Sequence, residues 1–329
     1  MAIVTEVSSS AWGDFCHSRP NTPIFQTPEM YSVYSKTTGL APNAVFELTD
    51  GEMTGCLLSV RQVWAANRVA SLFARSLILS GPIGDGTTQR TLLRHHQLRA
   101  NHASIFSEIR PFLPDEALKA AAVSCGFRWE PHLNYLLDLS QGEQVLWDSM
   151  SKSRRKNIRS AERAGLHLRL VDGNESVLRL SELVQSTYAR AGLPPPDRTL
   201  FQAAHEVLGS CGRWIAVLAE HGGRPVAGRA VLVSDGFMHD WYAGSTDHGR
   251  EVHADEWLVW ELLKQGVADS FRTFDFGGAG SVGEYGPGEF KRRFGGRSVS
   301  PGRMIMVHRP VEYLIARTIW KALNRVRRR

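Results

Sequence analysis

The stretch "HADEWLVWELLKQGVADSFRTFDFGG", residues 253–278, predicts a helix followed by a short strand that ends in two glycines. The apolar side of this helix is formed by Trp257, Leu258, Trp260, Leu263 and Val267. Glycines at a strand end let a ligand approach the backbone closely. Upstream, residues 213–236 predict two strands joined by a tight turn at Gly222 and Gly223. The order is therefore a hairpin, a helix and another strand.

The first half of the chain repeats this order. Residues 43–62 predict a hairpin whose turn is Asp50-Gly51, and residues 87–112 predict a helix followed by a strand near 107–110. The two patterns are offset by roughly 165 to 170 residues. We therefore expect an α/β (α+β) protein made of two copies of one domain, each with a mixed, mostly antiparallel sheet flanked by helices.

The join between the two copies is expected near residues 140–165. "HLNYLLDLS" (132–140) predicts a strand and "QGEQVLWDSM" (141–150) a short helix. A basic helix then begins at a serine cap, Ser151 or Ser153, and ends before Gly165. Its apolar stripe is narrow, so we expect its cations outside: Arg154, Arg155, Lys156 and Arg159. The expected division is an N-terminal domain over 1–150, a basic connecting helix over 151–165, and a C-terminal domain over 166–329 that ends in a basic helix.

The composition is that of an ordinary globular protein, with 43% hydrophobic and 22% charged residues. No apolar run reaches the length of about 18 residues that spans a bilayer. The first twenty residues show no secretory signal pattern. The four cysteines are scattered singly, which argues against a disulfide framework or a zinc site and favours a reducing cytoplasm.

The positive charge is concentrated in two places. The tail, residues 317–329, holds six Lys and Arg residues and no acid, so without it the net charge of +6 becomes 0. The second cluster is "SKSRRKNIRSAER", residues 151–163, with six cations against Glu162. Such clusters suit nucleic acid, a nucleotide or pyrophosphate substrate, or anionic lipid. The alternative is a solvated helix face and a frayed tail.

The last segment, residues 311–329, alternates apolar and basic residues at helical spacing. It could lie on an anionic membrane surface, such as the inner face of the cytoplasmic membrane. The alternative is a terminal helix that packs on its own domain.

Two stretches of the second half carry candidate site residues. Strand alternation over 239–242 places His239 with Trp241 on one face and Asp240 with Tyr242 on the other, and either pair could line a cleft. In "GEFKRRFGG" (288–296), Phe290 and Phe294 are four residues apart and would fix the direction of Lys291. A lysine held beside a glycine-rich strand end could stabilise negative charge forming on a carbonyl. The alternative is a purely structural turn.

These motifs also resemble those of a known family. "WYAGSTDHGREVHADEWLVWELLKQGVADSFRTFDFGGAG", followed by "GEFKRRFGG", is similar to the C-terminal signature of the FemABX family. "LLDLSQGEQVLWDSMSKSRRKNIRSAERAGL" (136–166) resembles a second stretch of that family. FemABX proteins are non-ribosomal peptidyltransferases that use aminoacyl-tRNA to build the side chains of peptidoglycan precursors. The specific motifs lie within about 132–297, and the family's paired GNAT-like domains agree with the repeat.

The resemblance implies a mechanism and a set of residues. A substrate amine attacks an aminoacyl ester, and Lys291 of the Phe-Lys-x-x-Phe-Gly motif stabilises the oxyanion. No metal and no tightly bound cofactor are needed; aminoacyl-tRNA, or acyl-CoA, is the co-substrate. The second partner is a phosphate-bearing cell-envelope precursor such as a peptidoglycan stem peptide. The expected substrate-binding residues are Arg154, Arg155, Lys156, Arg159, Trp241, Tyr242, Asp275, Gly277, Gly278, Phe290 and Phe294.

The sequence departs from the family pattern in lacking a long charged helical hairpin, which some relatives use to contact tRNA. It also lacks the [RQ]xxGx[GA] loop typical of acetyl-CoA enzymes. Two alternatives stay open: an acyl-CoA-dependent N-acyltransferase in polysaccharide or lipid tailoring, and a non-catalytic RNA- or membrane-binding protein. In each case we expect a cytoplasmic location, with peripheral membrane contact through the basic tail.

Overall fold

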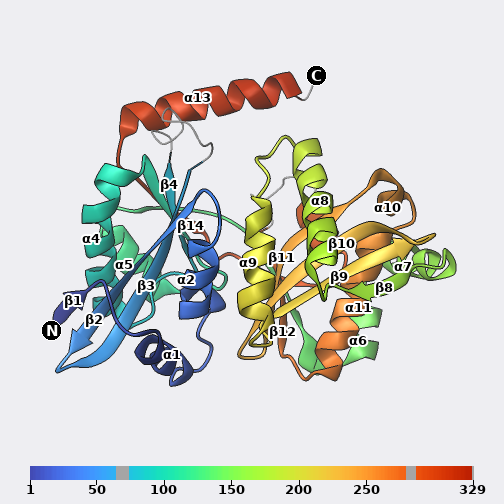
Figure 1. Ribbon diagram of the computed structural model, residues 1–329, viewed down its shortest axis with the longest axis horizontal. Coiled ribbons are helices and arrows are strands. Elements are labelled where there is room, and N and C mark those ends of the chain that lie inside the picture. The colour runs from blue at the N-terminus through green and yellow to red at the C-terminus, as the bar shows by residue number, and fades with distance from the viewer. Residues whose placement is uncertain (64–73, 279–286, 328–329) are drawn as a thin grey trace. The chain divides into compact units, whose positions relative to one another are not determined.

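The computed structural model describes residues 1–63, 74–278 and 287–327, and of residues 320–327 it describes the backbone only. The chain forms two compact units (Figure 1). The first contains Met1–Pro131 and Pro301–Arg329, and the second contains His132–Ser300. Each unit is built on one sheet.

The sheet of the first unit has seven strands among the described residues. In spatial order they are β1 (Ala2–Val4), β2 (Leu40–Thr49), β3 (Glu52–Gln62), β4 (Arg75–Leu79), β5 (Phe106–Arg110), β14 (Arg303–Val307) and β6 (Arg128–Glu130). Neighbours are antiparallel except β4 and β5, which are parallel.

Helices cover both faces of this sheet. They are α1 (Ser9–His17), η1 (Ile24–Gln26), α2 (Pro28–Ser35), α4 (Gly86–Ala103) and α5 (Glu116–Ser124). The chain ends in a further helix, α13 (Pro310–Arg327). Leu92 and Leu93 of α4 and Leu118 of α5 join the core formed with one face of the sheet. On the other face Trp12 of α1 packs edge-on against Phe46 of β2, with ring centroids 4.9 Å apart.

The second unit repeats the strand order of the first. Its strands are β8 (His167–Leu170), β9 (Trp214–His221), β10 (Arg224–Ser234), β11 (Phe237–Ser245), β12 (Thr273–Gly278), β7 (Asn134–Asp138) and β13 (Arg297–Val299). Here too a single neighbouring pair, β11 with β12, is parallel among the described strands. The expected pair of mixed, mostly antiparallel α/β domains is confirmed.

The helices of the second unit lie on both faces of its sheet. They are η2 (Leu139–Gln141), α6 (Glu143–Ser149), α7 (Lys152–Arg163), α8 (Asn174–Arg190), α9 (Arg198–Gly209), α10 (Asp247–Glu251), α11 (Ala254–Ala268) and α12 (Pro287–Arg292). The core around α11 contains Trp257, Leu258 and Trp260, as its spacing predicted. On the other face α8 approaches β11 so closely that a Cβ on Gly244 would lie 2.3 Å from the Leu183 carbonyl carbon.

The predicted turns and caps are present. Asp50 and Gly51 join β2 to β3 with φ of 54° and 86°, and Gly222 and Gly223 join β9 to β10 with φ of 58° and 74°. These left-handed conformations suit a tight hairpin turn. The Ser151 hydroxyl oxygen accepts a hydrogen bond from the N–H of Arg154 at 3.2 Å and so caps α7.

The bounds of the two units differ from the ranges expected from the sequence because each sheet takes one strand from a distant part of the chain. β14, near the C-terminus, lies between β5 and β6, where Arg303 pairs with the buried Glu108 at 3.1 Å. β7 lies between β12 and β13 of the second sheet. The first unit therefore ends at Pro131 rather than at 150, and residues after Ser300 return to it. The hydrophobic periodicity of a segment predicts a strand but does not show which sheet that strand joins.

Candidate functional site

The candidate site lies in the second unit, at the end of the parallel pairing between β11 and β12. Residues 237–239 of β11 pair with 273–275 of β12, and His239 with Asp275 is the last pair between these described strands. β11 continues to Ser245 and β12 to Gly278. Backbone groups beyond the last pair are therefore available to other partners.

Asp275 is buried at this point and holds the end of β12. One carboxylate oxygen accepts hydrogen bonds from the Asn134 side-chain amide and from the N–H of Gly277, each at 2.7 Å. The other lies 3.2 Å from Nδ1 of His239. Gly277 has a φ of 70°, which favours glycine. Asp275 thus fixes a bend in β12, where the pairing with β7 shifts register between Asp275 and Gly278.

Lys291, on α12, reaches this bend. Its Nζ donates to the carbonyl oxygens of Phe276 at 2.6 Å, Gly277 at 3.0 Å and Gly278 at 2.7 Å. The rings of Phe290 and Phe294 pack together with centroids 5.3 Å apart, as their spacing predicted. Residues 279–286 of the glycine-rich stretch lie outside the described residues.

The groups around Lys291 shift the pKa of its ammonium group in opposite directions. Burial lowers the pKa of its ammonium group to about 8, while the carboxylates of Asp240 and Asp275 act to raise it and the guanidinium of Arg229 acts to lower it. A protonated Lys291 places its charge beside the backbone carbonyls at the end of β12. Such a charge can stabilise an oxyanion that forms within its reach.

A buried network next to this lysine was missed by the sequence analysis. Arg229 of β10 forms ion pairs with Asp240 of β11 at 2.5 Å and with Asp255 of α11 at 3.6 Å. Burial alone would lower the pKa of Arg229, but the two carboxylates outweigh it and the pKa is raised. The available signal was one arginine inside the otherwise apolar run of β10.

The expectation that Arg154 lies on the outside of its helix is wrong. Its side chain is 4% exposed and pairs with Glu256 of α11 at 2.7 Å. The guanidinium carbon lies 4.4 Å from the ring centroid of Phe290 and 4.5 Å from that of Phe294, and one nitrogen donates to the Phe290 carbonyl at 3.1 Å. Arg154 precedes the buried Ile158 by four residues and so shares its inward face. Arg154 therefore contacts the two residues, Phe290 and Phe294, that flank Lys291.

The other predicted cations of α7 are more accessible. Arg155 is half-buried and donates to the carbonyl oxygen of Asp148 at 3.2 Å. Lys156 and Arg159 are exposed, and Arg159 lies over the ring of Trp147 at 5.2 Å.

The predicted separation of Trp241 and Tyr242 onto opposite faces is also wrong. Ala230 of β10 pairs with Tyr242 and the next residue, Val231, pairs with Asp240, so Trp241 is an extra residue in a β-bulge. Both rings contact Phe201 of α9, and their own centroids are 4.9 Å apart. The two residues belong to one aromatic cluster with Phe201.

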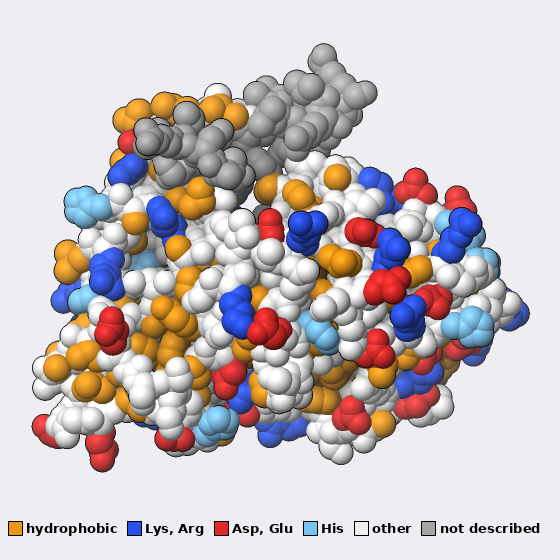
Figure 2. Space-filling view, in the orientation of Figure 1, with side chains coloured by type: hydrophobic (Ala, Val, Ile, Leu, Met, Phe, Trp, Pro, Cys, Tyr) orange, Lys and Arg blue, Asp and Glu red, His pale blue; other side chains and the backbone are white. Residues whose placement is uncertain are grey.

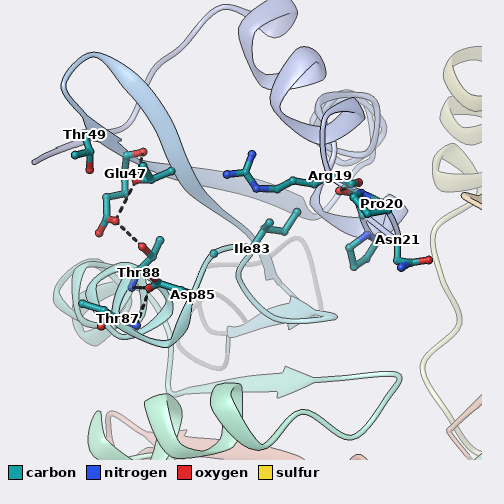
Figure 3. A pocket seen from close by; sticks show the side chains of 13 residues that line it. Arg19, Pro20, Asn21, Glu47, Thr49, Ile83, Asp85, Thr87 and Thr88 are labelled. Carbon is teal, nitrogen blue, oxygen red and sulfur yellow. Dashed lines mark hydrogen bonds between the residues drawn. The ribbon is translucent and has the colours of Figure 1, made fainter.

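The first unit holds a separate cavity of about 700 Å³ (Figure 3). Arg19 extends into it from the loop after α1, and Glu47 borders it from β2. Glu47 accepts hydrogen bonds from the hydroxyls of Thr88 at 2.7 Å and Thr54 at 3.1 Å. The lining combines a guanidinium, carboxylates and hydroxyls, which suits a polar ligand. Its residues come from three separate segments, so no local motif indicated it.

The repeated strand order, with one parallel pair in each sheet, defines a double GNAT-like fold. Residues 149–292 match the family model described as an acetyltransferase (GNAT) domain. The structure of FemX superposes with a TM-score of 0.72 at 14% identity, covering 96% of this chain and 100% of that one. The chain therefore has a FemABX-like double GNAT fold.

Two further solved structures share this fold. A tandem GNAT protein from the clavulanic acid biosynthesis pathway gives a TM-score of 0.60 at 14% identity, with 93% and 98% of the two chains covered. The C-terminal domain of a putative lysylphosphatidylglycerol synthetase from Agrobacterium fabrum gives 0.58 at 12% identity, with 91% of each covered. The comparison with curated proteins found no match.

The domain match and the fold identify the chain as an acyltransferase. One of its substrates is accordingly an acyl donor. Within the described residues, no group of three or more His, Cys, Asp or Glu side chains is placed to hold a metal ion.

Proposed function

We propose that this acyltransferase moves an aminoacyl group from aminoacyl-tRNA onto an amine of a cell-envelope precursor, such as a peptidoglycan stem peptide. The observation that carries the proposal is the position of Lys291, whose ammonium group sits at the bent end of β12 on a FemX-like fold. Because charged tRNA and nucleotide-linked precursors are cytoplasmic, we place the reaction in the cytoplasm.

The proposed reaction needs no protein nucleophile, because the aminoacyl ester is already activated. The acceptor amine attacks the ester carbonyl, a C–N bond forms, and negative charge collects on the carbonyl oxygen. Collapse of this intermediate breaks the ester C–O bond, and the proton lost by the amine passes to the departing ribose hydroxyl. Lys291 would stabilise the oxyanion by exchanging one of its three carbonyl acceptors for it.

The remaining residues have supporting roles in this proposal. Asp275 would hold Gly277 and Gly278 in the bend that Lys291 contacts. Arg154 would position Phe290 and Phe294 rather than touch the substrate. We assign phosphate binding to Lys156 and Arg159, which are exposed, and to Arg155 at their side. Trp241 and Tyr242 would shape the sheet next to the site through the β-bulge.

Turnover is expected to fall as the pH rises through about 8. The pKa of Lys291 is lowered from 10.5 to about 8, so its ammonium form, which stabilises the oxyanion, is fully present only below that value. In a Lys291→Arg variant the charge persists to much higher pH, so this fall should disappear even where the rate is lower. Initial rates of both proteins, corrected for uncatalysed ester hydrolysis, would be measured over roughly three pH units around the shifted pKa, from about pH 6.5 to about 9.5. The same fall in both proteins would contradict the role of Lys291 as the stabilising cation.

A second candidate is an acyl-CoA-dependent N-acyltransferase acting in polysaccharide or lipid tailoring. It is supported by the acetyltransferase domain match and by the edge of β11 beyond His239, where an amide-bearing chain could add to the strand. The putative lysylphosphatidylglycerol synthetase domain that shares this fold is named for a lipid product, which fits the lipid form of this candidate.

One experiment separates the two donors. The purified protein is incubated with a UDP-linked peptidoglycan precursor and either charged tRNA or a panel of acyl-CoA thioesters, and transfer is followed with a labelled acyl group. Transfer from charged tRNA alone supports the first proposal. Transfer from a CoA thioester, with tRNA inert, would replace it by the second.

A further inference from the structure

The C-terminal helix α13 exposes its apolar side chains. Four of them lie in the part whose side chains are described: Val311, Leu314, Ile315 and Ile319, with exposed fractions of 69%, 64%, 46% and 49%. Their spacing of three and four residues places them on one face. Figure 2 shows hydrophobic side chains gathered along this part of the helix.

This face is not the one that attaches the helix to its own unit. Tyr313 packs edge-on against Phe106 of β5, with ring centroids 5.4 Å apart. Before the helix, Arg309 donates from its side chain to the His102 carbonyl at 2.8 Å, and its N–H donates to the Ile105 carbonyl at 3.1 Å. A helix that packed by its apolar face would bury Leu314 and Ile315, which are exposed instead.

The charges of the same segment indicate what covers this face. Residues 317–329 contain six Lys and Arg residues and no acid. Arg317, Lys321 and Arg325 follow one another at intervals of four residues, which lines their Cα atoms along one side of the helix. Apolar residues bordered by a row of cations match a surface that offers both hydrocarbon and negative charge. No helix in the described part of the chain is long and apolar enough to cross a membrane.

We propose that α13 binds the surface of an anionic lipid bilayer, lying parallel to it with Val311, Leu314, Ile315 and Ile319 inserted among the acyl chains. The positive charge that the sequence concentrates in residues 317–329 attracts the helix to the negative lipid headgroups. This attachment does not depend on which donor or acceptor the enzyme uses.

Vesicle flotation of the full-length protein tests this. Vesicles are made of phosphatidylcholine alone or of phosphatidylcholine mixed with phosphatidylglycerol. We expect flotation with the mixed vesicles only, weakened by salt. Replacing Arg317, Lys321 and Arg325 by Gln should lower partitioning on the order of 100-fold, because each cation near an anionic surface strengthens binding roughly fivefold.

The apolar contribution is tested with Leu314→Asp/Ile315→Asp, which should abolish flotation. The matched control is Leu168→Asp/Leu170→Asp on β8, where the two leucines are 43% and 57% exposed. This control should float like the wild type, and circular dichroism checks that both variants are folded. Equal flotation with both vesicle types, or none with either, would overturn the proposal. So would a concentration-dependent dimer that Leu314→Asp/Ile315→Asp abolishes in a protein that does not float.

Discussion

Lys291→Met is expected to lower turnover about 10²- to 10³-fold, the usual cost of removing one oxyanion-stabilising donor. Methionine is of similar length but carries neither charge nor donor. In the structure the lysine gives all three of its N–H groups to backbone carbonyls of residues 276–278. Loss of these bonds should also lower the free energy of unfolding by about 1–3 kcal/mol, because the carbonyl of the buried Phe276 loses this donor.

Rates must therefore be compared at a temperature where both proteins are folded, as judged by circular dichroism. Lys264→Met is the matched control: it removes a lysine from α11 that pairs with Glu261 at 2.9 Å, away from the bend of β12. Its turnover should stay near that of the wild type. Near-normal turnover in a folded Lys291→Met protein would exclude Lys291 from the chemistry and leave it as a brace for the glycine bend.

Arg154→Ala is expected to lower the free energy of unfolding by about 3–5 kcal/mol, because it leaves a partly buried carboxylate, that of Glu256, without its cation. It also removes the guanidinium that lies over the rings of Phe290 and Phe294. Since those rings flank Lys291, turnover should fall as well. Urea titration measures the first effect and the transfer rate the second.

Arg159→Ala serves as the control for Arg154→Ala, because it removes an exposed arginine from the same helix. Its unfolding free energy should change by no more than about 0.5 kcal/mol. A double-mutant cycle with Glu256→Ala isolates the ion pair, and we expect the two single effects not to add. A small stability change in Arg154→Ala, together with a raised KM for the acceptor, would instead assign Arg154 to substrate binding.

The sequence predicted the elements of the second unit because each has a strong local signal. The hairpin turn at Gly222 and Gly223 needs left-handed backbone, and glycine supplies it. The helix over 254–268 follows from its buried Trp257, Leu258 and Trp260. Motif resemblance then selected Lys291, which periodicity alone could not distinguish from a lysine in a structural turn.

The remaining features depend on contacts between distant segments. Arg154 is one of six cations on a basic helix, and its burial depends on Glu256, which lies on a distant helix. The β-bulge at Trp241 appears only when β11 is aligned with β10. The sheet that β7 or β14 joins is likewise decided by the strands with which it pairs, and the strand propensity of its own residues does not predict this. The cavity beside Glu47 is assembled from three separate segments of the chain and is hidden from local patterns for the same reason.

Mass spectrometry of the acceptor tests the central claim most directly. The full-length protein is incubated with charged tRNA and a UDP-linked peptidoglycan precursor, and with the same precursor whose free amine has been acetylated. We predict that the free amine gains one aminoacyl residue as an amide and that the acetylated precursor is unchanged. A folded protein that leaves both precursors unmodified with charged tRNA and with acyl-CoA donors alike, or that modifies the acetylated one equally, would contradict transfer to this amine.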